Sequence, residues 1–111
     1  MASQINTFRT VTANVTTSNT IVYTTPIGIT SIVLMAHCSN ITQNNHNVYF
    51  NHVSNTGVRT ELLSQYPVLK RDAVGLLTGK LIVEQNNSVE IYSSSDNALK
   101  LTMSVLESTN A

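Results

Sequence analysis

Apolar and polar residues alternate with a period of two near the carboxyl end of the chain. In the stretch NALKLTMSV, Leu99, Leu101, Met103 and Val105 are separated by lysine, threonine and serine. This period is typical of a strand that buries one face. Leu101 and Met103 are therefore predicted to face a core, whereas Lys100 and Thr102 are predicted to face solvent or a partner.

The two segments before this strand alternate in the same way. SVEIYSS places Val89 and Ile91 on one side and Glu90 and Tyr92 on the other, and GKLIVE places two apolar residues against Lys80 and Glu84. The intervening QNN and SSSDN stretches have the composition of turns. The last third of the chain is thus predicted to form a three-stranded antiparallel meander.

The first half of the chain shows the same strand and turn pattern. VTANV and NTIVYTT alternate until Pro26–Gly28 interrupts them, and VYFNHV places Val48 and Phe50 inward before the turn at Asn55–Gly57. The window Val58–Leu69 has some apolar residues at helical spacing, but Pro67 limits it to one helical turn at most.

One segment breaks the alternation, because Ile32–Ala36 is continuously apolar. Such a strand is covered on both faces, by the opposing sheet on one side and by a neighbour on the other. A two-layer sandwich covers only one of those faces, so a second subunit or a docking partner is expected on the other. The candidate interface residues are Ile32, Val33, Leu34 and Met35.

These segments predict about seven or eight short strands and no long helix. The expected fold is all-β, an antiparallel β-sandwich or a jelly-roll-like barrel, formed by residues 1–111 as a single domain.

Composition and charge restrict the partners of this domain. Charged residues make up 11% of the chain, against about 25% in typical soluble domains. The formal net charge is zero, which favours neither nucleic acid nor an anionic membrane as a partner. Little repulsion keeps copies apart, so a homo-oligomer is expected. No membrane-length apolar run or signal-peptide pattern occurs, and synthesis in a cytoplasm is expected.

All three histidines and the only cysteine fall within HCSNITQNNHNVYFNH, residues 37–52. His37 and Cys38 are neighbours on a predicted strand, so their side chains leave opposite faces. At most two of His37, Cys38, His46 and His52 can converge, which is too few ligands for a zinc site. We therefore predict no metal and no cofactor.

No catalytic constellation stands out elsewhere. Glu84 and Glu90 could face each other across the QNNSV turn, but any hairpin offers that geometry. Gly75 and Gly79 lack the spacing of a phosphate-binding loop. The sequence therefore favours a protein that is not an enzyme.

A resemblance rests on the order of elements over about residues 20–107. YTTPIGITSIVLMAHCSN contains a turn at Pro26–Gly28 followed by the apolar strand Ile32–Asn40, and Lys80–Ser94 and the Ser-x-x-Glu of Ser104–Glu107 follow later. This pattern resembles small all-β virion proteins of tailed bacteriophages, especially phages of marine and freshwater bacteria. The resemblance implies a non-enzymatic tail, neck or head-decoration protein, located in the virion and bound to other virion proteins.

Two other classes of protein remain open. A carbohydrate-binding β-sandwich would use exposed aromatic rings, for which Tyr23, Tyr49, Tyr66 and Tyr92 are the candidates, although the chain has no tryptophan. A small cupin-like metalloenzyme would require the histidines to converge, which their spacing disfavours.

Overall fold

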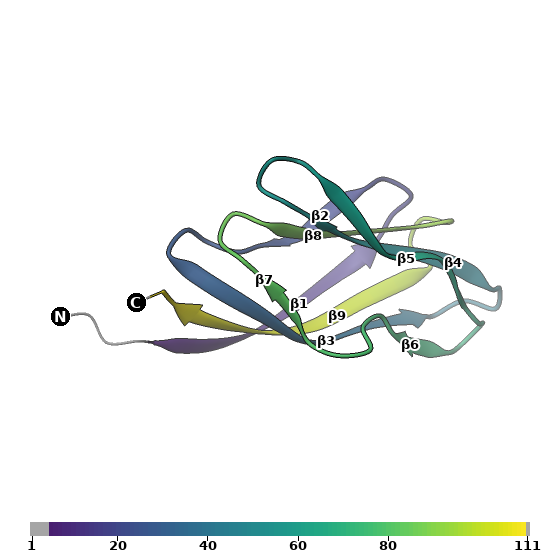
Figure 1. The fold of residues 1–111 in the computed structure, drawn as a ribbon. Helices are drawn as coiled ribbons and strands as arrows, with labels where there is room; N and C mark the ends of the chain where they lie inside the picture. Colours follow the sequence, from purple (N-terminus) through teal and green to yellow (C-terminus); the bar gives the residue numbers. More distant parts are fainter. Residues whose placement is uncertain (1–4, 111) are drawn as a thin grey trace.

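The computed structural model describes residues 5–110 and is all-β, as the sequence predicts (Figure 1). The prediction that the chain has no signal-peptide pattern involves residues 1–4, which lie outside this range. The strands of the described residues are β1 (Asn6–Val15), β2 (Thr20–Thr24), β3 (Ile29–Asn40), β4 (His46–Val53), β5 (Arg59–Val68), β6 (Ala73–Gly75), β7 (Leu81–Val83), β8 (Ser88–Ser93) and β9 (Leu99–Thr109). Over these residues there is no helix with the length and apolarity of a membrane span.

The strands form two antiparallel sheets that pack face to face (Figure 1). Sheet A has the order β1-β9-β3-β6, with β7 also paired to β3, and sheet B has the order β2-β8-β4-β5. Most strands that are consecutive in the chain lie in opposite sheets. This alternation is the arrangement of a two-sheet jelly roll, so the predicted β-sandwich class is confirmed.

The predicted meander of the last third is wrong. β7 and β9 both belong to sheet A, where each pairs with β3, whereas β8 belongs to sheet B between β2 and β4. The QNN and SSSDN stretches therefore cross from one sheet to the other. Alternation shows that a segment is a half-buried strand, but it does not identify the strand that lies beside it.

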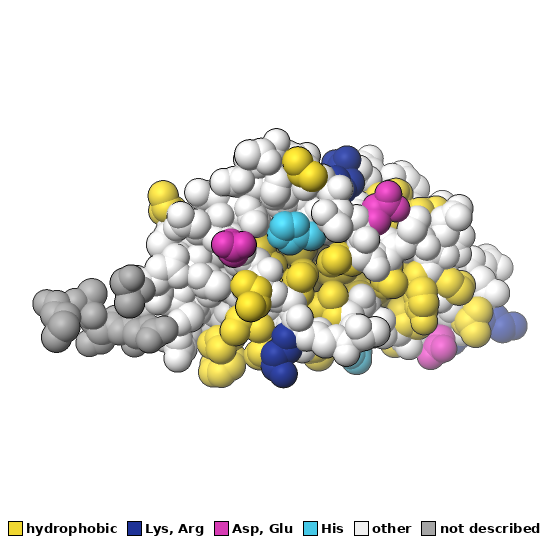
Figure 2. Space-filling view, viewed as in Figure 1, with side chains coloured by type: hydrophobic (Ala, Val, Ile, Leu, Met, Phe, Trp, Pro, Cys, Tyr) yellow, Lys and Arg dark blue, Asp and Glu magenta, His cyan; other side chains and the backbone are white. Residues whose placement is uncertain are grey.

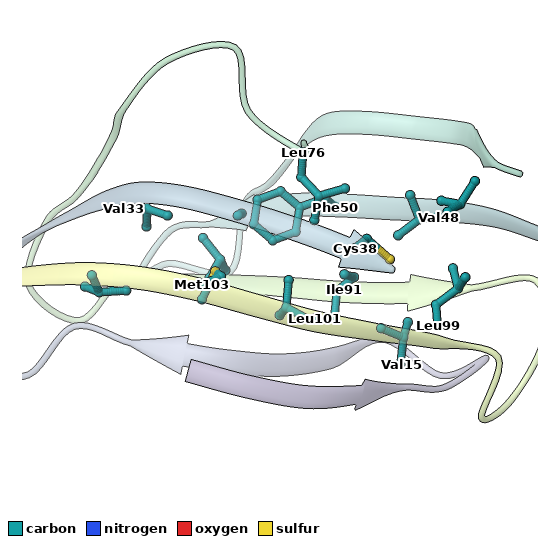
Figure 3. Close-up of a cluster of buried hydrophobic side chains, with 14 of the residues drawn as sticks. Val15, Val33, Cys38, Val48, Phe50, Leu76, Ile91, Leu99, Leu101 and Met103 are labelled. Carbon is teal, nitrogen blue, oxygen red and sulfur yellow. The ribbon is translucent and has the colours of Figure 1, made fainter. Parts of the chain in front are cut away.

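The core lies between the sheets and is formed by the residues at inward positions of both (Figure 3). Leu101 and Met103 of β9 are buried while Thr102 is exposed, which confirms the predicted register of this strand. Val48 and Phe50 of β4 are also fully buried, as predicted. The large inward side chains come from distant parts of the chain, so a single core ties both sheets together.

The Val58–Leu69 window, for which the sequence allows one helical turn at most, contains no helix, since the chain there forms strand β5. The register of β5 against β4 shifts twice, and Gln65 has a φ of 50°. These irregularities place the consecutive residues Leu62 and Leu63 against the core, which explains the helix-like spacing of apolar residues in this window. The turns predicted at Pro26–Gly28 and Asn55–Gly57 are present, and each ends in a glycine with a positive φ.

Candidate functional site: an apolar outer surface

The four candidate interface residues on β3 do not all face the same way. Val33 is fully buried in the core, where it is unavailable to a partner. Ile32, Leu34 and Met35 are half-buried. The register against β9 shifts between Val33 and Met35, so an extra residue stands there. This bulge lets both Leu34 and Met35 lie on the outer side of sheet A, between the inward Val33 and the inward Ala36.

An apolar row crosses sheet A at the level of Ile32. Phe8 of β1 is opposite Leu106 of β9, Leu106 is opposite Ile32, and Ile32 is opposite Ile82 of β7. Residues that are directly opposite in antiparallel strands share one face. Phe8 is 74% exposed and Ile82 is 60% exposed. Four neighbouring strands thus contribute large apolar side chains to the outer face at one level.

We call the row of Phe8, Leu106, Ile32 and Ile82, together with Leu34 and Met35, the outer apolar surface. A hollow of about 220 Å³ adjoins it, lined by Leu34 and Met35 and by the 75–80 connection between β6 and β7. The hollow lies where the edge of β3 is paired with neither β6 nor β7. A partner side chain could therefore enter the surface at this point.

Apolar side chains also gather on one open side of the sandwich, between β5 and β7 (Figure 2). Half-buried leucines from both sheets and from the β6–β7 connection pack against the core, and these include Leu62, Leu63, Leu77 and Leu81. Their contact with the core gives them a role in folding, so their presence alone does not indicate a binding surface.

The outer face of sheet B has a different character. Tyr49 of β4 and Tyr92 of β8 are opposite each other, and their rings stack with centroids 4.3 Å apart and planes 2° from parallel. Two of the four candidate tyrosines therefore meet. Tyr66 is exposed on β5, whereas the Tyr23 hydroxyl is hydrogen-bonded to Ser31, 2.7 Å away, and donates to Glu107.

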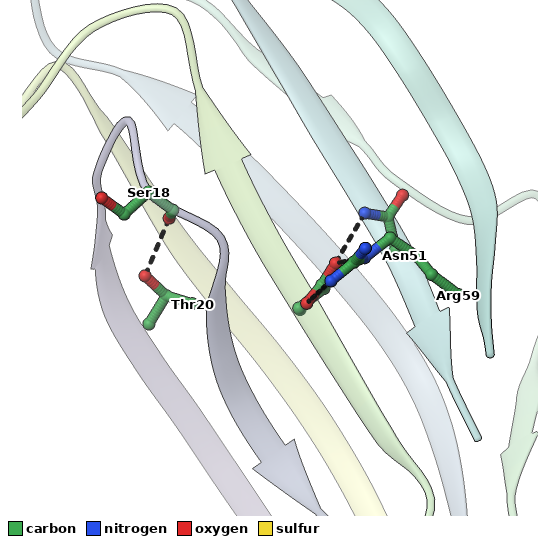
Figure 4. Close-up of polar contacts among 5 residues, drawn as sticks. Ser18, Thr20, Asn51 and Arg59 are labelled. Carbon is green, nitrogen blue, oxygen red and sulfur yellow. Dashed lines mark hydrogen bonds and ion pairs between the residues drawn. The ribbon is translucent and has the colours of Figure 1, made fainter. Parts of the chain in front are cut away.

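Glu90 lies beside this tyrosine pair on the outer face of sheet B, yet it is only 3% exposed. Asn51 and Arg59 converge on its carboxylate (Figure 4), with Asn51 Nδ2 donating to Oε1 at 2.9 Å and Arg59 Nε donating to the same oxygen. Burial alone would raise the pKa of Glu90, but these hydrogen bonds and the charge of Arg59 outweigh burial and lower it. The Oδ1 of Asn51 is buried with no hydrogen-bond partner among the described residues.

A second buried carboxylate, Glu107 of β9, lies on the inward side near one end of the sandwich. It accepts hydrogen bonds from Arg9 Nε at 2.6 Å and from the Tyr23 hydroxyl of sheet B. Burial raises the pKa of Glu107, but these two hydrogen bonds and the charge of Arg9 outweigh burial and lower it. Because Tyr23 and Glu107 come from opposite sheets, their hydrogen bond links the two sheets.

The cluster of histidines and cysteine does not form a site. His37 is exposed and Cys38 is buried, on opposite faces of β3 as predicted. Burial raises the pKa of the Cys38 thiol to about 12, which leaves it protonated and unreactive near neutral pH. His46 is the first residue of β4, and its Nε2 lies 3.1 Å from the Thr42 hydroxyl. Over residues 5–110, no three His, Cys, Asp or Glu side chains are arranged to hold a metal ion.

Sequence reasoning missed the partners of both buried carboxylates. It named only Glu84 as a possible neighbour of Glu90, whereas Glu84 lies in the connection that crosses between the sheets and Glu90 pairs with Arg59 of β5. Glu107 entered only as part of a Ser-x-x-Glu motif. The available signal was its place in the alternation, since Glu107 follows Met103 and Val105 at the same spacing as the inward residues of β9.

No family model and no curated protein matches this chain. A search of solved structures finds a similar protein whose description reads "Bacillus endospore appendages form a novel family of disulfide-linked pili". The TM-score is 0.60 at 12% sequence identity, over 98% of this chain and 90% of the other. At this level of identity, the similarity supports the fold.

Proposed function

We propose that this protein is a non-enzymatic structural component of a tailed-bacteriophage virion, a tail or neck module or a head-decoration protein. In this proposal it associates with its own copies and docks on other virion proteins. The observation that carries the proposal is the outer apolar surface. The sequence pattern supplies the bacteriophage context, and the structure supplies a surface suited to docking.

Apolar side chains that stay exposed to water on the outer face of sheet A favour association with another molecule. Single exposed apolar residues are ordinary, but a contiguous group on one sheet face is typical of an interaction site. Phe8 and Ile82 lie at the two ends of the apolar row, with half-buried Leu106 and Ile32 between them. Covering this row would remove apolar area from water, which favours association in proportion to the area buried.

The similar pilus protein is compatible with an assembly role but not with the same chemistry. Its description names disulfide-linked pili. Here the only cysteine is Cys38, which is fully buried and has a raised pKa. Association of this chain would therefore rely on noncovalent contacts.

The association can be tested with two matched isoleucines. Ile82 is 60% exposed on the outer face of sheet A, and Ile21 is 55% exposed on sheet B. We expect the full chain to sediment at micromolar concentration as a species larger than 12.1 kDa. Ile82→Asp should yield a smaller species, whereas Ile21→Asp should not. A wild-type chain that remains monomeric would overturn the proposal.

The location in a virion requires a separate measurement. Antibodies raised against the purified protein should label intact phage particles at the tail, neck or head surface in electron micrographs. Labelling would also distinguish attachment proteins from head decoration. Particles that carry the gene but remain unlabelled, and whose protein composition lacks this chain, would refute the virion assignment.

The stacked tyrosines favour one second candidate, a carbohydrate-binding module. Tyr49 and Tyr92 are half-buried, and each ring has one face turned away from the other ring, which is the type of surface that sugars stack on. In a screen of soluble oligosaccharides by calorimetry, this alternative predicts binding that Tyr92→Ala abolishes. Absence of any binding by the wild-type chain would exclude it for the sugars tested.

A further inference from the structure

We propose that the free edge of β1 is the site where two copies of this chain join, by antiparallel pairing of β1 with β1 of the second copy. This inference rests on the proposed function, since it specifies how copies associate. It assigns the edge of sheet A to the second copy and leaves the outer apolar surface for further docking. Within the described residues, no strand pairs with this side of β1.

The hydrogen-bonding groups at this edge can be identified from the register. The backbone N–H of Thr109 donates to the carbonyl of Ile5 at 3.1 Å, one residue beyond the first β1–β9 pair. Hydrogen-bonded and non-hydrogen-bonded pairs alternate along an antiparallel ladder. The odd-numbered residues of β1 therefore bond to β9, and the even-numbered residues turn their N–H and C=O groups outward. The residues with outward groups are Asn6, Phe8, Thr10, Thr12 and Asn14.

The other edges of the two sheets are less suited to strand addition. β5 has two register shifts, a positive φ at Gln65 and a proline at Pro67. β2 has five residues and a register shift, and β6 and β7 have three residues each. Short strands, bulges and proline are the usual means by which proteins block pairing at an edge. In contrast, β1 has ten residues and pairs with β9 without a register shift.

The order of side chains along β1 favours a second copy of the same strand. The five edge residues read Asn, Phe, Thr, Thr, Asn, which is nearly palindromic about Thr10. Antiparallel pairing about a two-fold axis at Thr10 places Thr10 opposite its own copy, Phe8 opposite Thr12 and Asn6 opposite Asn14. This register pairs all five edge residues at once. Direct Thr–Thr pairs are among the favourable cross-strand pairs.

The same register avoids unfavourable charges. Arg9 is the only charged residue of β1, and pairing about Thr10 places it opposite Val11 of the second copy. Its guanidinium stays with Glu107, 2.6 Å away on the inward side. Pairing would also bring the apolar rows of the two copies onto one continuous sheet, because Phe8 is the end of the row that lies on β1.

The experiment uses Ile82→Asp as the background, so that docking through the outer apolar surface does not obscure edge pairing. Sedimentation velocity should show this variant as a dimer. Adding Thr10→Lys or Thr10→Glu places like charges face to face at the two-fold axis. Each substitution is expected to raise the dissociation constant of the dimer by about tenfold or more. An equimolar mixture of the two should restore a dimer at low salt. Thr60→Lys, an exposed position on the β5 edge, is the matched control and should remain dimeric.

Several results would overturn the inference while leaving the proposed function intact. One is a monomeric Ile82→Asp variant that still has Thr10, because the edge would then contribute no pairing. Another is dimerisation unaffected by either charge at Thr10. A third is a mixture of the lysine and glutamate variants that stays monomeric, which would exclude pairing about Thr10. Circular dichroism of each variant establishes that the β-structure is retained.

Discussion

The outer faces of the two sheets differ in a way that separates their roles. On sheet A, the outer face carries a row of apolar side chains from Phe8 to Ile82, with Leu34 and Met35 beside it. On sheet B, the outer face carries a stacked tyrosine pair and a buried carboxylate that is bonded to Asn51 and Arg59. On sheet B, these contacts join side chains of β4, β5 and β8 across the outer face.

One sandwich can therefore have one outer face that is stabilised by contacts within its own sheet and another outer face that exposes apolar side chains. Polar and aromatic contacts on sheet B bind its strands to one another across their outer side. Sheet A has few such contacts at the level of its apolar row, and in the proposed function another molecule covers this surface.

Inward residues of the two sheets should contribute about equally to the free energy of unfolding. Phe50→Ala in sheet B and Leu101→Ala in sheet A each leave a cavity in the same core, where both side chains are fully or almost fully buried. We expect losses of about 3–5 and 2–5 kcal/mol in the free energy of unfolding, respectively. Urea unfolding measures both. A large loss for one and none for the other would mean that the sheets do not share a core.

Substitution of the buried carboxylates should cause the next largest loss in the free energy of unfolding. Glu90→Gln in sheet B and Glu107→Gln in sheet A remove a charge bonded to an arginine, at an expected cost of about 1–3 kcal/mol each. Removing Glu107 should also weaken the contact between the sheets, because Tyr23 bonds to it from the opposite sheet. Glu90→Gln should leave that contact unchanged. Near-ultraviolet circular dichroism of the tyrosines, combined with urea unfolding, distinguishes the two results.

The same carboxylates predict a loss of stability in acid. The pKa values of Glu90 and Glu107 are lowered in the folded state from an ordinary value of 4.5. Their stabilising contribution is therefore fully present well above pH 4.5 and is lost as the pH falls through the folded pKa values. The free energy of unfolding should decrease below about pH 4.5. A variant with both glutamines should show a flatter profile, and an identical slope would contradict this assignment.

A smaller effect is expected from the stacked tyrosines. The interaction between Tyr49 and Tyr92 should contribute about 0.5–1.5 kcal/mol beyond the area that each buries. A double-mutant cycle with Tyr49→Ala, Tyr92→Ala and the double variant isolates this coupling. Zero coupling would show that the outer face of sheet B is not stabilised by its own aromatic contact.

The smallest effect should come from the outward side of β9. Thr102 is exposed and lies opposite Thr12 and His37, so Thr102→Ala should change the free energy of unfolding by less than about 0.5 kcal/mol. Compared with Leu101→Ala, this substitution tests the register of the strand by urea unfolding. Equal losses for the two neighbours would mean that the two faces of β9 are misassigned.

The elements themselves could be predicted from the sequence because burial of one strand face imposes a period of two. β9 follows this rule along its whole length, and Val48 and Phe50 follow it in β4. The continuously apolar run Ile32–Ala36 also indicated that β3 has apolar side chains on both faces. Three of its four interface candidates do lie on the outer side of sheet A. Val33 belongs to the core because a strand directs alternate residues to opposite faces.

Strand partners and bulges could not be predicted, because both depend on contacts between distant parts of the chain. The QNN turn looks like a hairpin but crosses between the sheets, and the bulge at Leu34 exists only in the register with β9. Glu90 was placed correctly with Tyr92 on one face, but its burial could not be predicted. Its burial arises from Arg59 and Asn51, which the linear sequence places far away.

The position of β9 has a consequence for biosynthesis. β9 lies between β1 and β3 in sheet A, and it is the last of the described strands to leave the ribosome. β1 is made first and has no partner in sheet A until then, and before β9 is translated β3 can pair in that sheet only with the three-residue strands β6 and β7. Pairing of such distant segments is slow and exposes aggregation-prone strands. Chaperones that hold nascent chains should therefore increase the soluble yield, and a nascent chain stalled before Leu99 should stay sensitive to protease.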